Sequence, residues 1–208
     1  MDLTFLQICD LVCMAVFAVT GALAAIEKRL DFGGCFLLAF VTGVGGGTLR
    51  DLLLDRSVFW IQDPLPVFVC AAAATITFVM TRQVVRLRVA MLWGDALGLA
   101  LFSVVGAAVA SDANASPLVA VMMGALTASG GGIIREVIRN EIPALLQREF
   151  YISAALAGAA TLVALEAMDV PRGIAFGAGA VIAFALRAAG ITFGWSLPVA
   201  NPPENTDT

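Results

Sequence analysis

The stretch TGVGGGTLRD, residues 42–51, lies inside a strongly apolar segment, and a second stretch, TASGGGIIRE, follows at residues 127–136. Each stretch places three consecutive glycines ahead of an arginine and an acid. A glycine in a helix interior costs about 1 kcal/mol relative to alanine, so three in a row suit an ordinary helix poorly. An arginine at hydrocarbon depth is also costly, and it indicates a functional position. The chain therefore uses one unusual feature twice.

The composition is typical of an integral membrane protein. Of the 208 residues, 60% are hydrophobic and 13% are charged, and the mean hydropathy is +0.94. A soluble domain carries about 25% charged residues. Apolar segments near the length that crosses a bilayer recur along the chain, and seven are predicted: 3–25, 33–54, 65–81, 89–110, 116–138, 150–168 and 171–193.

Several kinds of site are excluded by the residue types. The chain has no histidine, the commonest general base and transition-metal ligand, so we expect neither an enzyme nor a metal site. The four cysteines, Cys9, Cys13, Cys35 and Cys70, lie in apolar runs without a CxxC pair, which favours small core or lipid-facing residues over a metal site or a disulfide. A basic patch of the nucleic-acid type is absent from the sequence, so no nucleic-acid partner is expected.

The two glycine stretches belong to an internal duplication. A shift of 85 residues aligns residues 10–51 with the second copy without a gap, and 12 of the 42 positions are identical. The aligned pairs include Asp10 with Asp95, Phe17 with Phe102, Gly21 with Gly106, Thr42 with Thr127, Arg50 with Arg135, and Asp51 with Glu136. Such self-similarity is a strong signal of a repeated structural unit.

Each copy contains three predicted spans, and three is odd, so the second copy must enter the membrane from the opposite side. We therefore predict an all-α integral membrane protein with seven transmembrane helices, built as two inverted three-helix repeats plus a seventh helix. The predicted units are residues 1–85, residues 86–170, the seventh helix at 171–193, and a disordered cytoplasmic tail at 194–208, which is rich in proline and polar residues.

The distribution of lysine and arginine predicts the orientation. With seven spans, one side collects Lys28, Arg29, Arg82, Arg86, Arg88, Arg139, Arg148 and Arg187, and the other side collects Arg56 and Arg172. Basic residues are enriched on the cytoplasmic side of membrane proteins. The bias places the N-terminus outside and the C-terminus in the cytoplasm, as expected for a multi-pass protein of a bacterial inner membrane.

The triple glycines have two interpretations. They could bend spans 2 and 5 near mid-membrane and free backbone carbonyls that coordinate a partly dehydrated cation, with hydroxyl oxygens from Thr42, Thr127 and Ser129. Alternatively, they could let two helices pack closely, which is the interpretation favoured for Gly21 and Gly106.

The two motif arginines have three candidate roles: pairing with acids as structure, gating a pore, or binding an anionic group. The intramembrane acids Asp10 and Asp95 occupy equivalent repeat positions and are candidate partners or cation sites. One buried ion-pair network without a transport role is the alternative for the whole set. The predicted ion path comprises Thr42, Gly45, Gly46, Gly47, Arg50, Asp51, Thr127, Ser129, Gly130, Gly131, Gly132, Arg135 and Glu136.

Two three-span units that carry GGGxxR[DE], followed by a seventh span, resemble the trimeric intracellular cation (TRIC) channel family, especially its bacterial members, whose unit is also labelled a glycine-transporter domain. The resemblance covers residues 5–193. It implies a homotrimer in the lipid bilayer, with one pore per subunit between the repeats, lined by the glycine kinks and conducting chiefly potassium. It implies no cofactor beyond the transported ion. Animal members also use a basic segment and bound phosphoinositide, so a bound lipid is a further candidate ligand.

The leading hypothesis is therefore a potassium channel with an ion path between the two repeats. The alternative is a secondary transporter for a small zwitterion such as glycine, in which an arginine would hold the carboxylate and an acid the ammonium group. A third class is a structural membrane protein that conducts nothing.

The inverted repeat predicts the sides of two loops. Asp112 in the loop between spans 4 and 5 should lie outside, and Arg86 in the loop between spans 3 and 4 should lie inside. Asp112→Cys should react with a membrane-impermeant thiol reagent added to intact cells, and Arg86→Cys should react only after permeabilisation. Labelling of both cysteines from outside would contradict the inverted topology.

Overall fold

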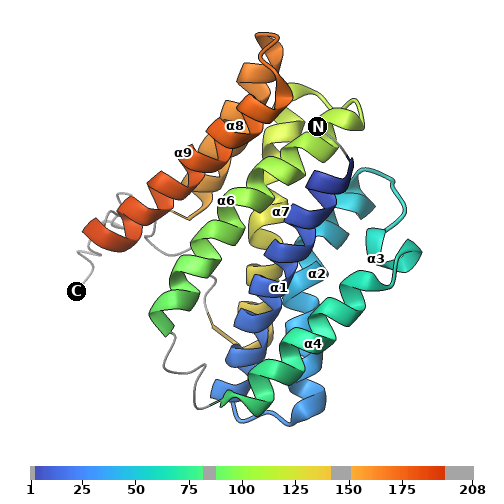
Figure 1. Cartoon of the computed structure of the whole chain (residues 1–208), viewed down its shortest axis with the longest axis vertical. Helices are drawn as coiled ribbons and strands as arrows, with labels where there is room; N and C mark the ends of the chain where they lie inside the picture. Colours follow the sequence, from blue (N-terminus) through green and yellow to red (C-terminus); the bar gives the residue numbers. More distant parts are fainter. Residues whose placement is uncertain (1–2, 82–87, 142–150, 195–208) are drawn as a thin grey trace, which may run out of the picture.

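The computed structural model describes residues 3–81, 88–141 and 151–194, and Figure 1 shows their arrangement. These ranges are almost entirely helical. The helices are α1 (Leu3–Glu27), α2 (Phe32–Leu53), α3 (Phe59–Gln62), α4 (Leu65–Val79), α6 (Arg88–Asp112), α7 (Pro117–Ile138), α8 (Ile152–Ala167) and α9 (Arg172–Phe193). All but α3 coincide with the seven predicted apolar segments to within a few residues.

The lengths of these helices confirm an all-helical membrane protein. Among the described residues, five helices are long and apolar enough to cross a bilayer: α1, α2, α6, α7 and α9. The helices α4 and α8 are shorter, with 15 and 16 residues, and both are apolar. The short α3 was not predicted, because its four residues lie between the predicted apolar segments 33–54 and 65–81. Apart from Gly194, the predicted tail lies outside the described residues.

The long helices form two groups that meet at α2 and α7. Helix α1 packs on α2 and α4, and α6 packs on α7 and α8 in the corresponding way. Figure 1 shows α1 running from the N-terminal end of the molecule to the opposite end, whereas α6 runs in the reverse direction. Helix α9 packs on α8 and α6, at the flank of the second group. The two halves therefore share one arrangement with opposite chain direction.

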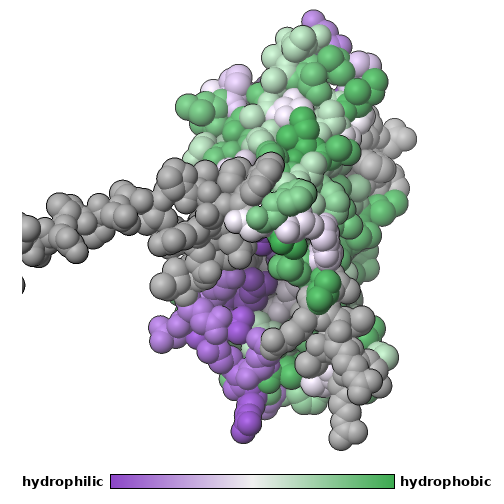
Figure 2. Space-filling model, turned by 90° about the vertical axis from the view of Figure 1, so that its left-hand side faces the viewer, coloured by the Kyte–Doolittle hydropathy of each residue, from purple (hydrophilic) through white to green (hydrophobic). Residues whose placement is uncertain are grey.

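The surface is divided between apolar and polar zones. Figure 2 shows hydrophobic residues over much of the visible face and a hydrophilic patch toward the lower end of the molecule, the end at which α1 terminates. Near the C-terminal ends of α1 and α7, Lys28 forms an ion pair with Glu141 at 3.0 Å, and Arg139 forms one with Glu27 at 3.0 Å. The hydrogen bond from Lys28 lowers the pKa of the Glu141 carboxyl. These pairs tie the end of one half to the end of the other.

Helices α2 and α7 cross backbone to backbone at their glycines. A Cβ added at Gly46 would fall on the carbonyl oxygen of Thr127, and a Cβ added at Gly131 would fall on the carbonyl oxygen of Thr42. The contacts are reciprocal, as the sequence repeat requires. The glycine stretches therefore serve as the close-packing surface between the halves, and Gly21 and Gly106 confirm the same prediction, because each lies against the next helix of its own half.

Neither helix is broken at its glycines. Helix α2 is continuous from Phe32 to Leu53, and α7 is continuous from Pro117 to Ile138. The described helices therefore show no break at these glycines, and the prediction that a bend there frees carbonyls for a cation stays a prediction. Backbone groups have no water to bond in hydrocarbon, so a continuous helix is favoured even where three glycines weaken it.

Aromatic residues join the two halves away from this crossing. The rings of Phe17 and Phe102, which the repeat aligns, stack with centroids 5.4 Å apart between α1 and α6. Both side chains are buried. Two residues at equivalent positions of the repeat therefore contact one another where the two halves meet.

The crossing predicts an asymmetry between glycines. Gly46→Ala should lower the thermal stability of the purified protein by about 1–3 kcal/mol, because the new methyl group must push α2 away from α7. Gly177→Ala in α9 is the matched control: nothing lies within 4 Å of its added Cβ. The control should be neutral or stabilising by up to about 1 kcal/mol, because it removes a glycine from a helix interior. Equal effects at both positions would contradict the close crossing.

Candidate functional site

The third glycine of each motif faces an aromatic residue from the connection that follows its helix. A Cβ at Gly47 would lie 2.8 Å from the ring of Phe59, and a Cβ at Gly132 would lie 3.6 Å from the hydroxyl oxygen of Tyr151. Phe59 and Tyr151 are not aligned by the 85-residue shift. Each motif is thus covered by an aromatic side chain from the connection after its helix, and the two side chains come from positions that the repeat does not align.

The arginine and acid of the first motif form a buried pair. The Nε and Nη2 atoms of Arg50 both lie 2.8 Å from Oδ1 of Asp51. Both residues are buried, with 4% and 2% of their surface exposed. Charge-assisted bonds of this kind offset much of the cost of burying two charges. The guanidinium charge is therefore compensated by the adjacent residue.

The same acid positions the connection that follows. The Oδ2 atom of Asp51 accepts a hydrogen bond from the backbone N–H of Phe59 at 3.1 Å, at the first residue of α3. The indole N–H of Trp60 donates to the hydroxyl oxygen of Thr48 at 2.9 Å, and its ring packs edge-on against Phe40. Helix α3 is held against α2 in this way, although it has only four residues.

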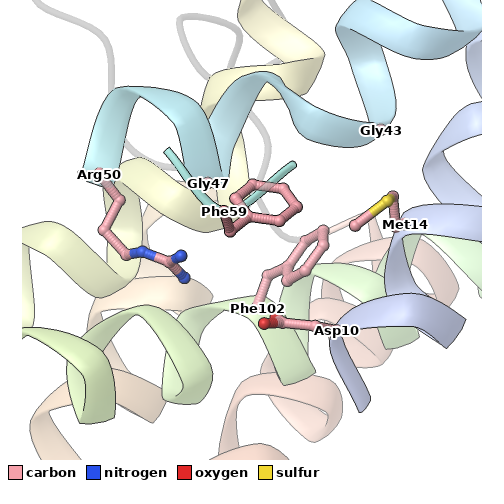
Figure 3. Close-up of a pocket in the computed structure, with 7 residues that line it drawn as sticks. All are labelled: Asp10, Met14, Gly43, Gly47, Arg50, Phe59 and Phe102. Atoms are coloured by element: carbon pink, nitrogen blue, oxygen red, sulfur yellow. The ribbon is translucent and has the colours of Figure 1, made fainter. Parts of the chain in front are cut away.

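A small pocket lies beside this pair (Figure 3). It is lined by Asp10 and Met14 of α1, by Gly43, Gly47 and Arg50 of α2, and by Phe59 and Phe102. Figure 3 shows the carboxylate of Asp10 and the guanidinium of Arg50 directed toward the same space, with the rings of Phe59 and Phe102 beside it. The pocket therefore joins residues from both halves of the duplication.

The second motif forms a corresponding cluster with different partners. The Nη2 atom of Arg135 lies 2.9 Å from Oε1 of Glu136, and its Nη1 donates to the hydroxyl oxygen of Thr20 at 3.0 Å. Asp95 is close enough to act electrostatically on both Arg135 and Tyr151. Thr20 belongs to α1, so this arginine bridges the two halves.

Helix α9 contributes a further cation to this second cluster. Arg187 is buried, with 3% of its surface exposed, and its guanidinium lies 5.0 Å from the ring centroid of Tyr151. A guanidinium over an aromatic face is attracted by the ring quadrupole. The sequence prediction counted Arg187 only among the cytoplasmic charges. Its position inside an apolar span was the signal that it belongs to a site, because charges at that depth face the protein interior.

The predicted site residues therefore separate into three groups. Gly45, Gly46, Gly130 and Gly131 lie at the helix crossing, Asp10, Gly47, Arg50 and Asp51 lie at one end, and Asp95, Gly132, Arg135 and Glu136 lie at the other. The hydroxyls of Thr42, Thr127 and Ser129 each donate to a carbonyl four residues earlier in their own helix, at 2.6, 2.6 and 2.7 Å. Their role as cation ligands stays a prediction.

Besides Arg187, the sequence prediction missed Phe59, Tyr151 and Thr20, and it also missed the pocket residues Met14, Gly43 and Phe102. Phe59 and Tyr151 lie in or beside connections, and Thr20 has no counterpart in the second copy, where the aligned residue is Val105. The cysteine prediction is confirmed for Cys13, Cys35 and Cys70, which are free and buried. Within residues 3–81, 88–141 and 151–194, no group of three or more His, Cys, Asp or Glu residues is arranged to hold a metal ion.

Comparison with known proteins identifies relatives over nearly the whole chain. The glycine transporter family profile matches residues 7–82 and again residues 92–167, which confirms the duplication and its 85-residue offset. The Escherichia coli K12 inner membrane protein YadS is 42% identical over 199 residues, covering 94% of this chain and 96% of that protein.

Solved structures give the same result. The TRIC trimeric intracellular cation channel orthologue from Rhodobacter sphaeroides superposes with a TM-score of 0.86 at 46% identity, covering 92% of this chain and 99% of that one. A TRIC cation channel solved to explain conductance superposes with a TM-score of 0.88 at 32% identity, covering 94% and 97%. The similarity therefore includes both the fold and the sequence.

Because the Arg50–Asp51 pair is buried, changing its carboxylate to an amide should lower the stability of the protein strongly. Asp51→Asn should lower thermal stability by about 3–5 kcal/mol, because it leaves Arg50 charged and buried without its carboxylate. The double variant Arg50→Gln with Asp51→Asn should recover most of that loss. Asp112→Asn, which disrupts an exposed pair with Arg172, is the control and should cost less than about 1 kcal/mol. Equal costs for Asp51→Asn and Asp112→Asn would contradict the pairing.

Proposed function

This chain belongs to the trimeric intracellular cation channel family, and from that premise we propose that it is a monovalent cation channel, chiefly for potassium. In this proposal it assembles as a homotrimer in a bacterial inner membrane, and each subunit carries its own ion path between the two repeats. The relatives support the assembly, because the Rhodobacter sphaeroides orthologue is named as trimeric and YadS is named as an inner membrane protein.

The proposed topology has seven crossings. The units are residues 1–85 and 86–170 as inverted repeats, then the helix at 171–193 and a cytoplasmic tail at 194–208. The opposite directions of α1 and α6 support the inversion. The excess of basic residues on one side supports an outer N-terminus and a cytoplasmic C-terminus. In this topology α4 and α8 cross as well, because each follows a spanning helix and leads to another.

The observation that carries the channel proposal is the local pairing of both motif arginines. A bare arginine in a cation path would be a barrier, since two unit charges 4 Å apart interact by about 4 kcal/mol at an effective dielectric near 20. Arg50 is compensated by Asp51, and Arg135 by Glu136. Each end of the crossing can therefore keep an arginine for structure or gating and still admit a cation.

The helix crossing supports the position of the proposed path. Next to the crossing, Gly47 and Gly132 carry no side chains, so the space beside them depends on Phe59 and Tyr151 and can change when those side chains move. The hydroxyl oxygens of Thr42 and Thr127 keep lone pairs while their hydrogens are bonded to the helix. Oxygen sites of this weak kind suit conduction, which requires an ion to leave as readily as it enters.

One observation favours the zwitterion transporter as a second candidate. Asp10 and Arg50 line one pocket with opposite charges, as an ammonium group and a carboxylate would require. Two others count against it: the pocket has room for about one water molecule, and Arg50 is already bonded to Asp51. A zwitterion such as glycine would have to displace that pair.

A flux experiment on the arginines separates the two functions. The purified protein in proteoliposomes should carry voltage-driven potassium flux and should accumulate no glycine. Arg50→Gln and Arg135→Gln should retain or increase potassium flux, because they remove a positive charge beside the path. A transporter requires the reverse, since a charge-assisted bond to a substrate carboxylate is hard to replace. Folding is checked by size-exclusion chromatography of each variant. Glycine uptake by the parent protein that folded arginine variants lose would refute the channel proposal.

A further inference from the structure

The carboxylate of Asp10 is the one charge of the pocket without a bonded partner among the described residues. Its Oδ1 atom is shielded from solvent and accepts no hydrogen bond there. The nearest cation lining the pocket is Arg50, which directs both its Nε and its Nη2 to Asp51. A carboxylate oxygen that is shielded from water and lacks a partner is costly, and the described residues supply none, so a bound cation would stabilise it.

The electrostatics of the pocket favour a cation. Asp51 and Arg50 cancel one another, so the charge of Asp10 is left over and the pocket is negative on balance. Two phenyl rings, from Phe59 and Phe102, flank the same space (Figure 3). Aromatic faces attract cations, and more strongly when the cation has lost its water. An anion would meet the Asp10 carboxylate and two phenyl rings.

The size and the ligand set restrict which cation fits. The space holds about one water-sized group, so a hydrated ion would have to lose most of its shell. A divalent cation such as calcium takes about 6–8 oxygen ligands, usually with several carboxylates. This pocket offers one unbonded carboxylate, and Arg50 stands beside it. A single positive charge is therefore the better match.

The second half of the duplication does not repeat this arrangement. Asp95 aligns with Asp10, but it acts on Arg135 and on the hydroxyl of Tyr151. Arg187 adds a further cation to that end of the molecule. Sequence equivalence alone would therefore give Asp10 and Asp95 the same role, whereas among the described residues their surroundings differ.

We infer that the pocket between α1, α2, α3 and α6 is a binding site for one partly dehydrated monovalent cation, with Asp10 as its charged ligand and the rings of Phe59 and Phe102 as its walls. The inference deepens the proposed function and rests on it for the identity of the ion, which would be potassium. The site lies at the end of the crossing where Arg50 lies.

A stability titration tests the site without relying on transport. Purified protein in detergent is titrated with potassium chloride, with N-methyl-D-glucamine chloride replacing it at constant ionic strength, and the melting temperature is recorded. The melting temperature of the parent protein should rise with potassium and saturate, because a ligand that binds only the folded state stabilises it. Asp10→Asn should be more stable than the parent without potassium, since it removes an uncompensated buried charge, and should show no potassium response.

Two variants serve as controls. Asp169→Asn removes an exposed carboxylate from a turn with a positive φ of 58°, which asparagine tolerates, and it should keep the full potassium response. Phe59→Leu keeps Asp10 and removes one ring, so it should weaken potassium binding by roughly two- to thirty-fold, the range from an exposed to a desolvated cation–π contact. Phe59→Leu also keeps the inference testable if Asp10→Asn does not fold.

The outcomes distinguish the site from the channel. A potassium response retained in Asp10→Asn, or lower stability of that variant without potassium, would overturn the site, because Asp10 would then serve only as a partner of Arg50. Rubidium soaked into crystals should give anomalous density beside the Asp10 carboxylate, and its absence at a saturating concentration would also overturn the site.

Voltage-driven flux in the parent with no potassium response in the melting temperature would refute the site and leave the channel standing. A response without any flux would support the site and refute the channel.

Discussion

Helices α2 and α7 approach until the backbone of one occupies the space that a side chain of the other would need. At Gly46 and Gly131 a methyl group would fall on a carbonyl oxygen of the facing helix, so only glycine is compatible with the crossing. Inside a bilayer the hydrophobic effect does not drive helices together, because lipid tails are apolar too, and close van der Waals contact takes over this role. The two halves of the chain meet through this contact, and both motif arginines come to lie at its ends.

Burial of charge is the second constraint, and it is met locally. Each motif arginine bonds the acid that follows it, so the pairs form wherever the helices carry them. The first pair also holds the backbone of α3, and this brings Phe59 over the pocket. The second pair is extended by Thr20 of α1, and Arg187 of α9 reaches the same end through Tyr151. Helix α9, which lies outside the two matched units, thus contributes a residue to one end of the site.

Much of this was predictable from the residues, because spans and repeats are properties of local pattern. The apolar segments gave the long helices, and the 85-residue shift gave the equivalence that the family profile repeats. The close crossing at the glycines was not predictable, because a triple glycine is compatible both with a broken helix and with a close crossing, and the two differ in what lies opposite. Phe59 and Tyr151 were missed because their positions depend on the path of a connection, which carries no periodic signal.

The sequence by itself determined the class of the protein, the order of its helices, the duplication and the residues that carry charge into the membrane. These features follow from the repeat itself, from the length of each apolar segment relative to the bilayer, and from the cost of a charge in an apolar segment. None of them requires knowledge of which residues are neighbours in space. Tertiary structure alone decided which equivalent residues became different. Asp10 and Asp95 occupy the same repeat position, but one faces a pocket between two phenyl rings and the other faces an arginine and a tyrosine. The reason is physical: a charge is compensated by whatever lies within a few ångströms, and those neighbours come from α3, α9 and connections that the repeat does not copy.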